Sequence, residues 1–225
     1  MLERKIPREI SFNEWVDYIF NHNDPNWYFV SSSEYLEWEG EDDSDLALEF
    51  MTKLFHAPLI YLQKFSEAQI SVGLEYITNL QFSSHAFALI SKDASLAKKR
   101  KCINSMYGLF FEFFSRSLKD ILYLSDGIEG RCKLSKICYM WWDILPIRGR
   151  KIHPLLEKTL LNTLNKILYI QHIPCIESSL HGLGHWFPYN KIETMRIVDA
   201  FLSRNWALPF EIIEYAKKAR EGQVE

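Results

Sequence analysis

Residues 154–168 read PLLEKTLLNTLNKIL, and residues 174–186 read PCIESSLHGLGHW. Leucines recur every three or four residues in the first segment, which places them on one face of a helix. A proline opens each segment, and proline is favoured in the first turn of a helix because the N–H it lacks would be unpaired there. The two segments therefore predict two consecutive amphipathic helices, the second of which ends at Pro188.

Two more helical patterns follow, over residues 192–202 and 209–222. The last third of the chain thus consists of two helix pairs, and the prolines that open the second helix of each pair, Pro174 and Pro209, are 35 residues apart. Pairs of amphipathic helices at a steady spacing are typical of an α-helical solenoid.

The chain before residue 154 also has helical patterns. Ser11 followed by Glu14 is a capping box, and it predicts a helix that ends near Asn21. Further helices are expected to begin at Ser44–Asp45, at Leu59, at Lys92–Ala94 (running to about Tyr123) and at Cys132 (running to Leu145).

Composition agrees with a folded helical protein. Of the 225 residues, 48% are hydrophobic and 24% are charged, which argues against disorder, and 9 Gly and 8 Pro are few for a β-sandwich or barrel. We predict an all-α fold in a single domain, residues 1–225, with eight or nine helices. Residues 1–43 would form an irregular N-terminal capping part, and residues 44–222 would form stacked antiparallel helix pairs.

The segment PCIESSLHGLGH at 174–185 resembles the second helix of a HEAT-type repeat, with a proline at its start and small residues, leucine and glycine after it. Residues 67–77, EAQISVGLEYI, have a similar layout. The resemblance is strongest over residues 154–222, and the long helix predicted near residues 94–123 departs from it. Membership of the HEAT and armadillo class implies a curved scaffold that binds other macromolecules, without implying a particular partner.

Glu177, His181 and His185 lie four residues apart and therefore form one stripe along a helix. Two histidines at this spacing can bind one zinc ion, and Glu177 could add a ligand. The metalloprotease pattern has a glutamate directly after the first histidine, where this chain has Gly182. The alternative is structural: Gly182 and Gly184 would admit a neighbouring helix, and the histidines would hydrogen-bond across the groove between helices.

A second cluster is Trp141, Trp142 and Asp143. Indole rings are strong binding anchors, so these residues could line a ligand groove. Alternatively, the tryptophans belong to the core and Asp143 pairs with Arg148 or Arg150.

Charge is unevenly distributed. Residues 1–91 carry 5 basic and 15 acidic side chains, whereas residues 92–151 carry 13 basic and 6 acidic ones. Between residues 34 and 49 there is no Lys or Arg, and the candidate partner-binding residues lie there: Glu34, Glu37, Trp38, Glu39, Glu41, Asp42, Asp43 and Asp45. Such a block is either a solvated loop or a steering surface for a basic protein. The basic run 98–101 is either the exposed side of a helix or a partner for this block.

Several features restrict the location and the class of function. The N-terminus has no apolar signal segment, no long uncharged stretch suggests a membrane span, and the four cysteines form no CxxC pair, so we expect a cytoplasmic protein. The net charge of −3 does not favour nucleic-acid binding. The common nucleotide-binding, hydrolase and metalloprotease motifs are missing, and no cofactor is expected.

The sequence therefore favours a non-catalytic protein that binds a basic macromolecule, for example an immunity-type protein that neutralises a basic toxin. The alternative is a metal-dependent hydrolase that uses Glu177, His181 and His185.

Overall fold

The structure is a computed structural model, and it describes residues 10–24, 26–27, 43–123, 132–148, 151–204 and 207–224. All regular secondary structure in these ranges is helical, which confirms the all-α prediction for the described part of the chain. Within the same ranges, no helix combines the length and the apolar character that crossing a bilayer requires.

The elements follow one another along the chain in this order: α1 (Phe12–Phe20), α2 (Ser44–His56), α3 (Pro58–Leu62), α4 (Glu67–Thr78), the 3-10 helix η2 (His85–Leu89), α5 (Leu96–Gly108), the π-helical η3 (Leu109–Phe114), α6 (Ser115–Ser117), α7 (Lys133–Ile144), α8 (Pro154–Ile167), α9 (Ile173–Trp186), α10 (Lys191–Leu202) and α11 (Phe210–Arg220).

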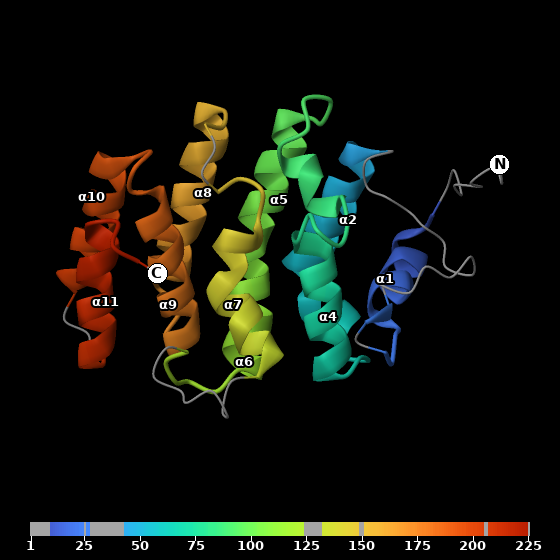
Figure 1. Cartoon of the computed structure of the whole chain (residues 1–225), viewed down its shortest axis with the longest axis horizontal. Helices are drawn as coiled ribbons and strands as arrows, with labels where there is room; N and C mark the ends of the chain where they lie inside the picture. The colour runs from blue at the N-terminus through green and yellow to red at the C-terminus, as the bar shows by residue number, and fades with distance from the viewer. Residues whose placement is uncertain are drawn as a thin grey trace.

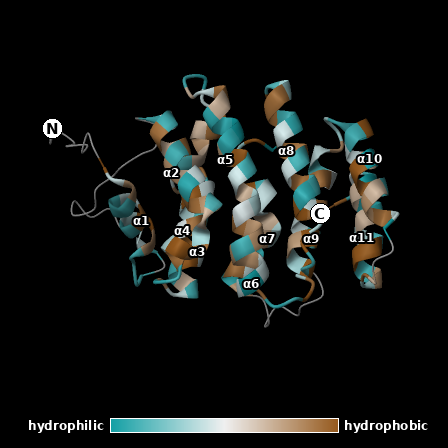
Figure 2. Ribbon diagram, turned by 180° about the vertical axis from the view of Figure 1, so that it is seen from behind, coloured by the Kyte–Doolittle hydropathy of each residue, from teal (hydrophilic) through white to brown (hydrophobic). Residues whose placement is uncertain are grey.

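The helices stand side by side, from α1 at one end to α10 and α11 at the other (Figure 1). Their contacts define two rows. In one row α2 packs on α5, α5 on α8, and α8 on α10; in the other, α1 packs on α4, α4 on α7, α7 on α9, and α9 on α11. The buried apolar side chains of both rows form one continuous core. Most helices carry both apolar and polar segments, as Figure 2 shows, because only part of each surface faces that core.

Local capping explains where several helices begin. The predicted capping box is present in α1, where the Ser11 N–H donates to Glu14 and the Glu14 N–H donates to Ser11. A second box, formed by Ser66 and Gln69, starts α4. This box and the turn before it divide the helix predicted from Leu59 into α3 and α4.

Two predicted helix starts were wrong by one or a few residues. Asp43, rather than Ser44 or Asp45, caps α2, because its carboxylate accepts the Leu46 N–H at 2.9 Å. The long helix begins at Leu96 rather than at residues 92–94. It continues through η3 and α6 and ends at Ser117, before Tyr123.

The long helix lies close against α2 at Gly108. A Cβ atom at this position would lie 2.6 Å from the backbone oxygen of Phe55, so the contact leaves no room for a side chain. Directly after Gly108 the helix widens into the π turn of η3, which buries Phe110, Phe113 and Phe114. Bulky aromatic side chains therefore directly follow a position where the two helices leave no room for a side chain.

The C-terminal helices agree with the prolines and glycines that predicted them. Pro154 occupies the first turn of α8, and α11 is followed, two residues after Arg220, by Gly222, which has a positive φ of 71°. The Gly222 N–H bonds to the Ala219 carbonyl and the Gln223 N–H to the Lys218 carbonyl. This is the glycine-terminated hydrogen-bond pattern that commonly ends a helix.

One buried histidine helps to fix α1 against the rest of the fold. The Trp15 indole N–H donates to Nε2 of His85 at 2.9 Å, so this nitrogen carries no proton. Nδ1 of His85 lies 2.9 Å from the Ser83 hydroxyl. Burial lowers the pKa of His85 to about 3, because no water stabilises the charged ring.

We predict that His85 makes the protein sensitive to acid. Between pH 6.5 and about 3, the imidazole of His85 binds a proton in the unfolded chain but stays neutral in the folded protein. The free energy of unfolding therefore falls as the pH falls. The contribution is about 1.4 kcal/mol per pH unit. In urea unfolding between pH 6 and 4, His85→Gln should flatten the pH dependence by about this slope. His56→Gln, which changes an exposed histidine, is the matched control. An H85Q slope equal to that of the unchanged protein would contradict the prediction.

Candidate functional site

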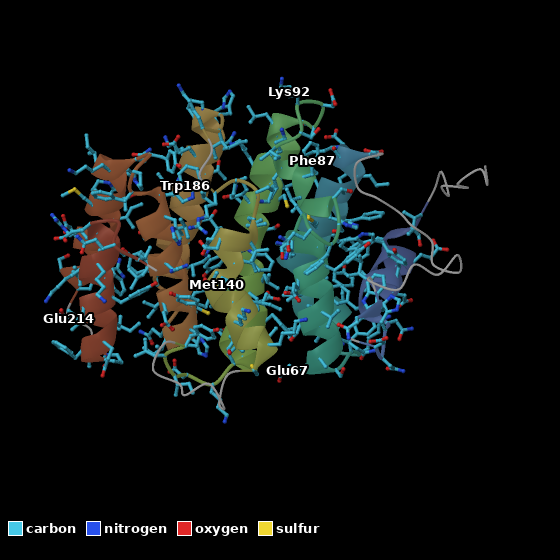
Figure 3. All side chains as sticks on the ribbon, in the orientation of Figure 1. Glu67, Phe87, Lys92, Met140, Trp186 and Glu214 are labelled. Atoms are coloured by element: carbon cyan, nitrogen blue, oxygen red, sulfur yellow. The ribbon has the colours of Figure 1, made fainter. Side chains whose placement is uncertain are left out.

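Three side chains converge between α7 and α9. Asp143 lies near the end of α7, and His181 and His185 lie one turn apart on α9. Nε2 of His181 is 3.1 Å from Oδ2 of Asp143, and Nε2 of His185 is 2.9 Å from Oδ1 of Asp143. The two Nε2 atoms are 3.1 Å apart. In Figure 3 the labels Met140 and Trp186 mark the two helices that carry this cluster.

Other groups support the cluster from outside. The guanidinium of Arg148 lies 3.1 Å from Oδ2 of Asp143, which is one of the pairings that the sequence suggested. On the other side of His181, its Nδ1 lies 2.7 Å from the hydroxyl of Tyr215, on α11. This hydroxyl in turn lies 2.9 Å from that of Tyr139, on α7. The chain of contacts therefore links three neighbouring helices of one row.

The cluster is largely shielded from solvent. The side chain of His181 is 0% exposed, that of Asp143 is 8% exposed and that of His185 is 15% exposed. Burial opposes the charge on Asp143, but its interactions with the two histidines outweigh this effect and hold the pKa of the carboxyl below its usual value. Burial also raises the pKa of Tyr139 to about 12, so its hydroxyl keeps its proton at neutral pH.

The arrangement can bind a cation. The nearest ligand atoms of Asp143, His181 and His185 all lie within 4.8 Å of one another, and they combine two imidazole nitrogens with a carboxylate oxygen. Imidazole and carboxylate are ligands that divalent transition metals accept. Among the described residues, this is the group of His, Cys, Asp and Glu side chains whose geometry suits a metal.

Glu177 lies outside the convergent group. Its carboxylate accepts the backbone N–H of Tyr123 at 2.7 Å, and the residue is buried. In place of Glu177, the third side chain beside the two histidines is Asp143, which the sequence had placed in the candidate ligand groove. The structure therefore brings His181 and His185 together with Asp143, and places Glu177 apart from them.

Trp141 and Trp142 are core residues. Trp141 packs edge-on against Phe55 and Phe114, and Trp142 stacks on Phe110 with ring centroids 5.8 Å apart. Both side chains are at most 2% exposed. Their indole faces are therefore occupied by the protein itself, which corrects the predicted ligand groove in favour of the core alternative.

The predicted acidic surface lies mainly outside the described residues. This applies to Glu34, Glu37, Trp38, Glu39, Glu41 and Asp42. The other two members have roles within the fold: Asp43 caps α2, and Asp45 accepts the Ser95 N–H at 2.8 Å and pairs with Lys98 at 2.9 Å.

A thiol–imidazole contact that the sequence did not predict lies at the start of α9. Sγ of Cys175 is 3.5 Å from Nδ1 of His172, and His172 borders a surface cavity of about 420 Å³. Contact with the Cys138 thiol and with His172 lowers the pKa of Cys175, although burial opposes this. Cys175 is 0% exposed, so no substrate reaches its sulfur and we assign it no catalytic role. Of the four cysteines, Cys132 is exposed and the other three are buried.

Comparison of the chain with protein-family models, with curated proteins and with solved structures finds no match. The function of the cluster therefore has to be argued from its own geometry.

The predicted close approach of a neighbour at the glycines of α9 is present. A Cβ atom on Gly182 would lie 2.8 Å from Cγ of Trp142 and 2.9 Å from a methyl group of Leu164. One on Gly184 would lie 2.4 Å from a methyl group of Val224, in the C-terminal segment. The first contact involves the inner part of the buried Trp142 ring on α7, whereas the second involves Val224, which lies beyond the end of α11 in a segment without regular secondary structure.

We predict that Gly182→Ala destabilises the fold more than Gly184→Ala. Alanine gains about 1 kcal/mol over glycine within a helix, but overpacking at Gly182 costs about 1–3 kcal/mol because the Trp142 ring cannot move aside. At Gly184, a small shift of the C-terminal segment that carries Val224 relieves most of the clash. Urea unfolding of the two variants measures the difference. Equal stability of the two variants, or a larger loss in G184A, would show that α9 is less tightly enclosed than the structure indicates.

Proposed function

We propose that the protein is a non-catalytic binding scaffold, a HEAT-like α-solenoid that holds another macromolecule against its surface. The observation that carries the proposal is the two-row arrangement, in which each helix packs chiefly on its neighbours in the same row and in the facing row. Helical arrays of this kind have extended surfaces along the stack, and such surfaces suit the binding of large partners.

Charge points to the nature of the partner. Lys98 on α5 lies 2.9 Å from Asp45 and 2.6 Å from Glu49, so one ammonium group bridges two carboxylates at the end of the acidic block. Hydrogen bonds to these carboxylates raise the pKa of Lys98. Two carboxylates of the block are thus already paired with a lysine of the same chain. Six more acidic side chains lie between residue 34 and Asp45 in the sequence. A basic protein is the partner that this charge would attract.

An immunity-type protein that neutralises a basic toxin in the cytoplasm is one concrete form of this proposal. Its support is the acidic block together with a small helical chain of 225 residues.

The hydrolase alternative predicted from the sequence used Glu177 as a metal ligand. Because the carboxylate of Glu177 bonds to the Tyr123 backbone instead, we base no catalytic step on it.

The test reverses charge within the acidic block. Asp43 and Asp45 are left unchanged because they stabilise α2 and the start of α5. The test variant changes Glu37, Glu39, Glu41 and Asp42 to lysine. The control variant, with the same change in net charge, reverses exposed acidic residues elsewhere in the chain, at Glu67, Asp93, Glu211 and Glu221.

We expect the unmodified protein and the control variant to capture the same basic protein from native lysate in near-equal amount. The test variant should lose it, because like charges now face each other across the interface, and the affinity of the unmodified pair should fall as salt rises. Mass spectrometry and binding measured over a salt series give these results. Undiminished capture by the test variant, or loss in both variants, would refute the assignment of the acidic block as the binding surface.

A further inference from the structure

We propose that Asp143, His181 and His185 form a binding site for a divalent transition-metal ion of the zinc type. The ion would bind Nε2 of both imidazoles and one carboxylate oxygen of Asp143, and would tie α7 to α9. This site is independent of the proposed partner-binding surface, and neither proposal requires the other.

The first argument is that protons alone cannot make all three contacts of the cluster hydrogen bonds. Asp143, in contact with Arg148, is ionised and can only accept hydrogen bonds. If both Nε2 atoms carry hydrogens directed at Asp143, neither can accept from the other across their 3.1 Å contact. If one of them accepts from the other, its lone pair then faces a carboxylate oxygen. At most two of the three contacts are therefore hydrogen bonds, whereas a cation at the centre makes all three favourable.

The second argument is a buried oxygen whose contact is poorly directed. Oδ1 of Asp143 is buried and lies 2.9 Å from Nε2 of His185, but no group of the described residues has the geometry of a hydrogen bond to it. The hydrogen-bonding contact of this Nε2 is with His181. A buried carboxylate oxygen that receives no well-directed hydrogen is available to bind an ion together with the neighbouring nitrogen.

The third argument is the spacing of the ligand atoms. Zinc binds histidine nitrogen and carboxylate oxygen at about 2.0–2.1 Å, so neighbouring ligands of a tetrahedral ion are about 3.3 Å apart. Two spacings in the cluster are close to this value: the Nε2 atoms are 3.1 Å apart, and Oδ1 of Asp143 lies 2.9 Å from Nε2 of His185. Nε2 of His181 contacts the other oxygen, Oδ2, at 3.1 Å, and one ligand atom of each residue lies within 4.8 Å of the other two. A small rotation of the Asp143 carboxylate would let a single oxygen face both nitrogens, and the fourth position of the ion would be left for water. Calcium and magnesium prefer all-oxygen sites, and the two nitrogens disfavour them.

The surroundings also fit a metal ligand. A histidine that binds metal through Nε2 carries its proton on Nδ1 and needs an acceptor for it. For His181 that acceptor is the hydroxyl of Tyr215, at 2.7 Å, and Tyr139 follows at 2.9 Å. The guanidinium of Arg148, a side chain that is 44% exposed, contacts Oδ2 of Asp143 and leaves Oδ1 for the ion.

The experiment uses the full chain, purified without a histidine tag and stripped of metal with a chelator. Titration with Zn²⁺ should show one ion bound per chain and a rise in Tm, because the ion links two helices and binds only the folded state. Co²⁺ should give the visible absorption of a four-coordinate ion and should be displaced by Zn²⁺. Mg²⁺ should do neither.

Variants assign the ligands. Asp143→Asn and His185→Gln keep the size of each side chain and should each weaken Zn²⁺ binding at least about tenfold, the loss that follows removal of even an outer-shell partner. Glu177→Gln and His153→Gln are the matched controls and should bind as the unmodified protein does. Circular dichroism confirms that each variant is folded before titration.

Three results would overturn the proposal. The first is an unmodified protein that binds no Zn²⁺ and gives no Co²⁺ spectrum, a measurement that depends on no variant. The second is binding that persists in both D143N and H185Q, which would place the ion elsewhere, for example at Cys132. The third is loss of binding in E177Q with retention in D143N, which would restore the ligand set expected from the sequence.

Discussion

The nearly complete burial of α9 is the constraint on which the rest of this structure depends. Almost every residue from Ile173 to Trp186 is buried, including four with polar side chains: Glu177, Ser178, Ser179 and His181. A polar group without a partner in such a place costs about 1–3 kcal/mol, so each of the four must find one on a neighbouring element. The fold around α9 is therefore shaped by hydrogen bonds as well as by apolar packing.

The partners of these four side chains lie in both rows of helices. Ser178 donates to the backbone of Cys138 on α7, and Ser179 donates to that of Leu164 on α8. Glu177 accepts from Tyr123, and His181 contacts Asp143 on α7 and Tyr215 on α11. Since α9 also meets α7 and α8 closely at Gly182, the same helix determines the spacing of its neighbours and the geometry of the cluster.

Local rules explain why most helices could be predicted. The capping box at Ser11, the proline at Pro154 and the glycine at Gly222 act within a few residues, so their effects can be read from the sequence alone. The errors arose where a competing local signal was overlooked, as with the second capping box at Ser66. The early end of the long helix, at Ser117, has a different cause. There the chain must turn toward α9, where Asp120 accepts the Ile173 N–H at 2.6 Å.

The sequence by itself determined that the protein is helical and that His181 and His185 share a helix face, because both follow from the pitch of a single helix. The third member of their cluster could not be inferred in this way. Asp143 is 38 residues from His181, and Glu177 is closer along the chain but is held by a backbone N–H from the segment after α6. Which carboxylate meets the two imidazoles depends on how α7 packs against α9, and only the tertiary structure decided that.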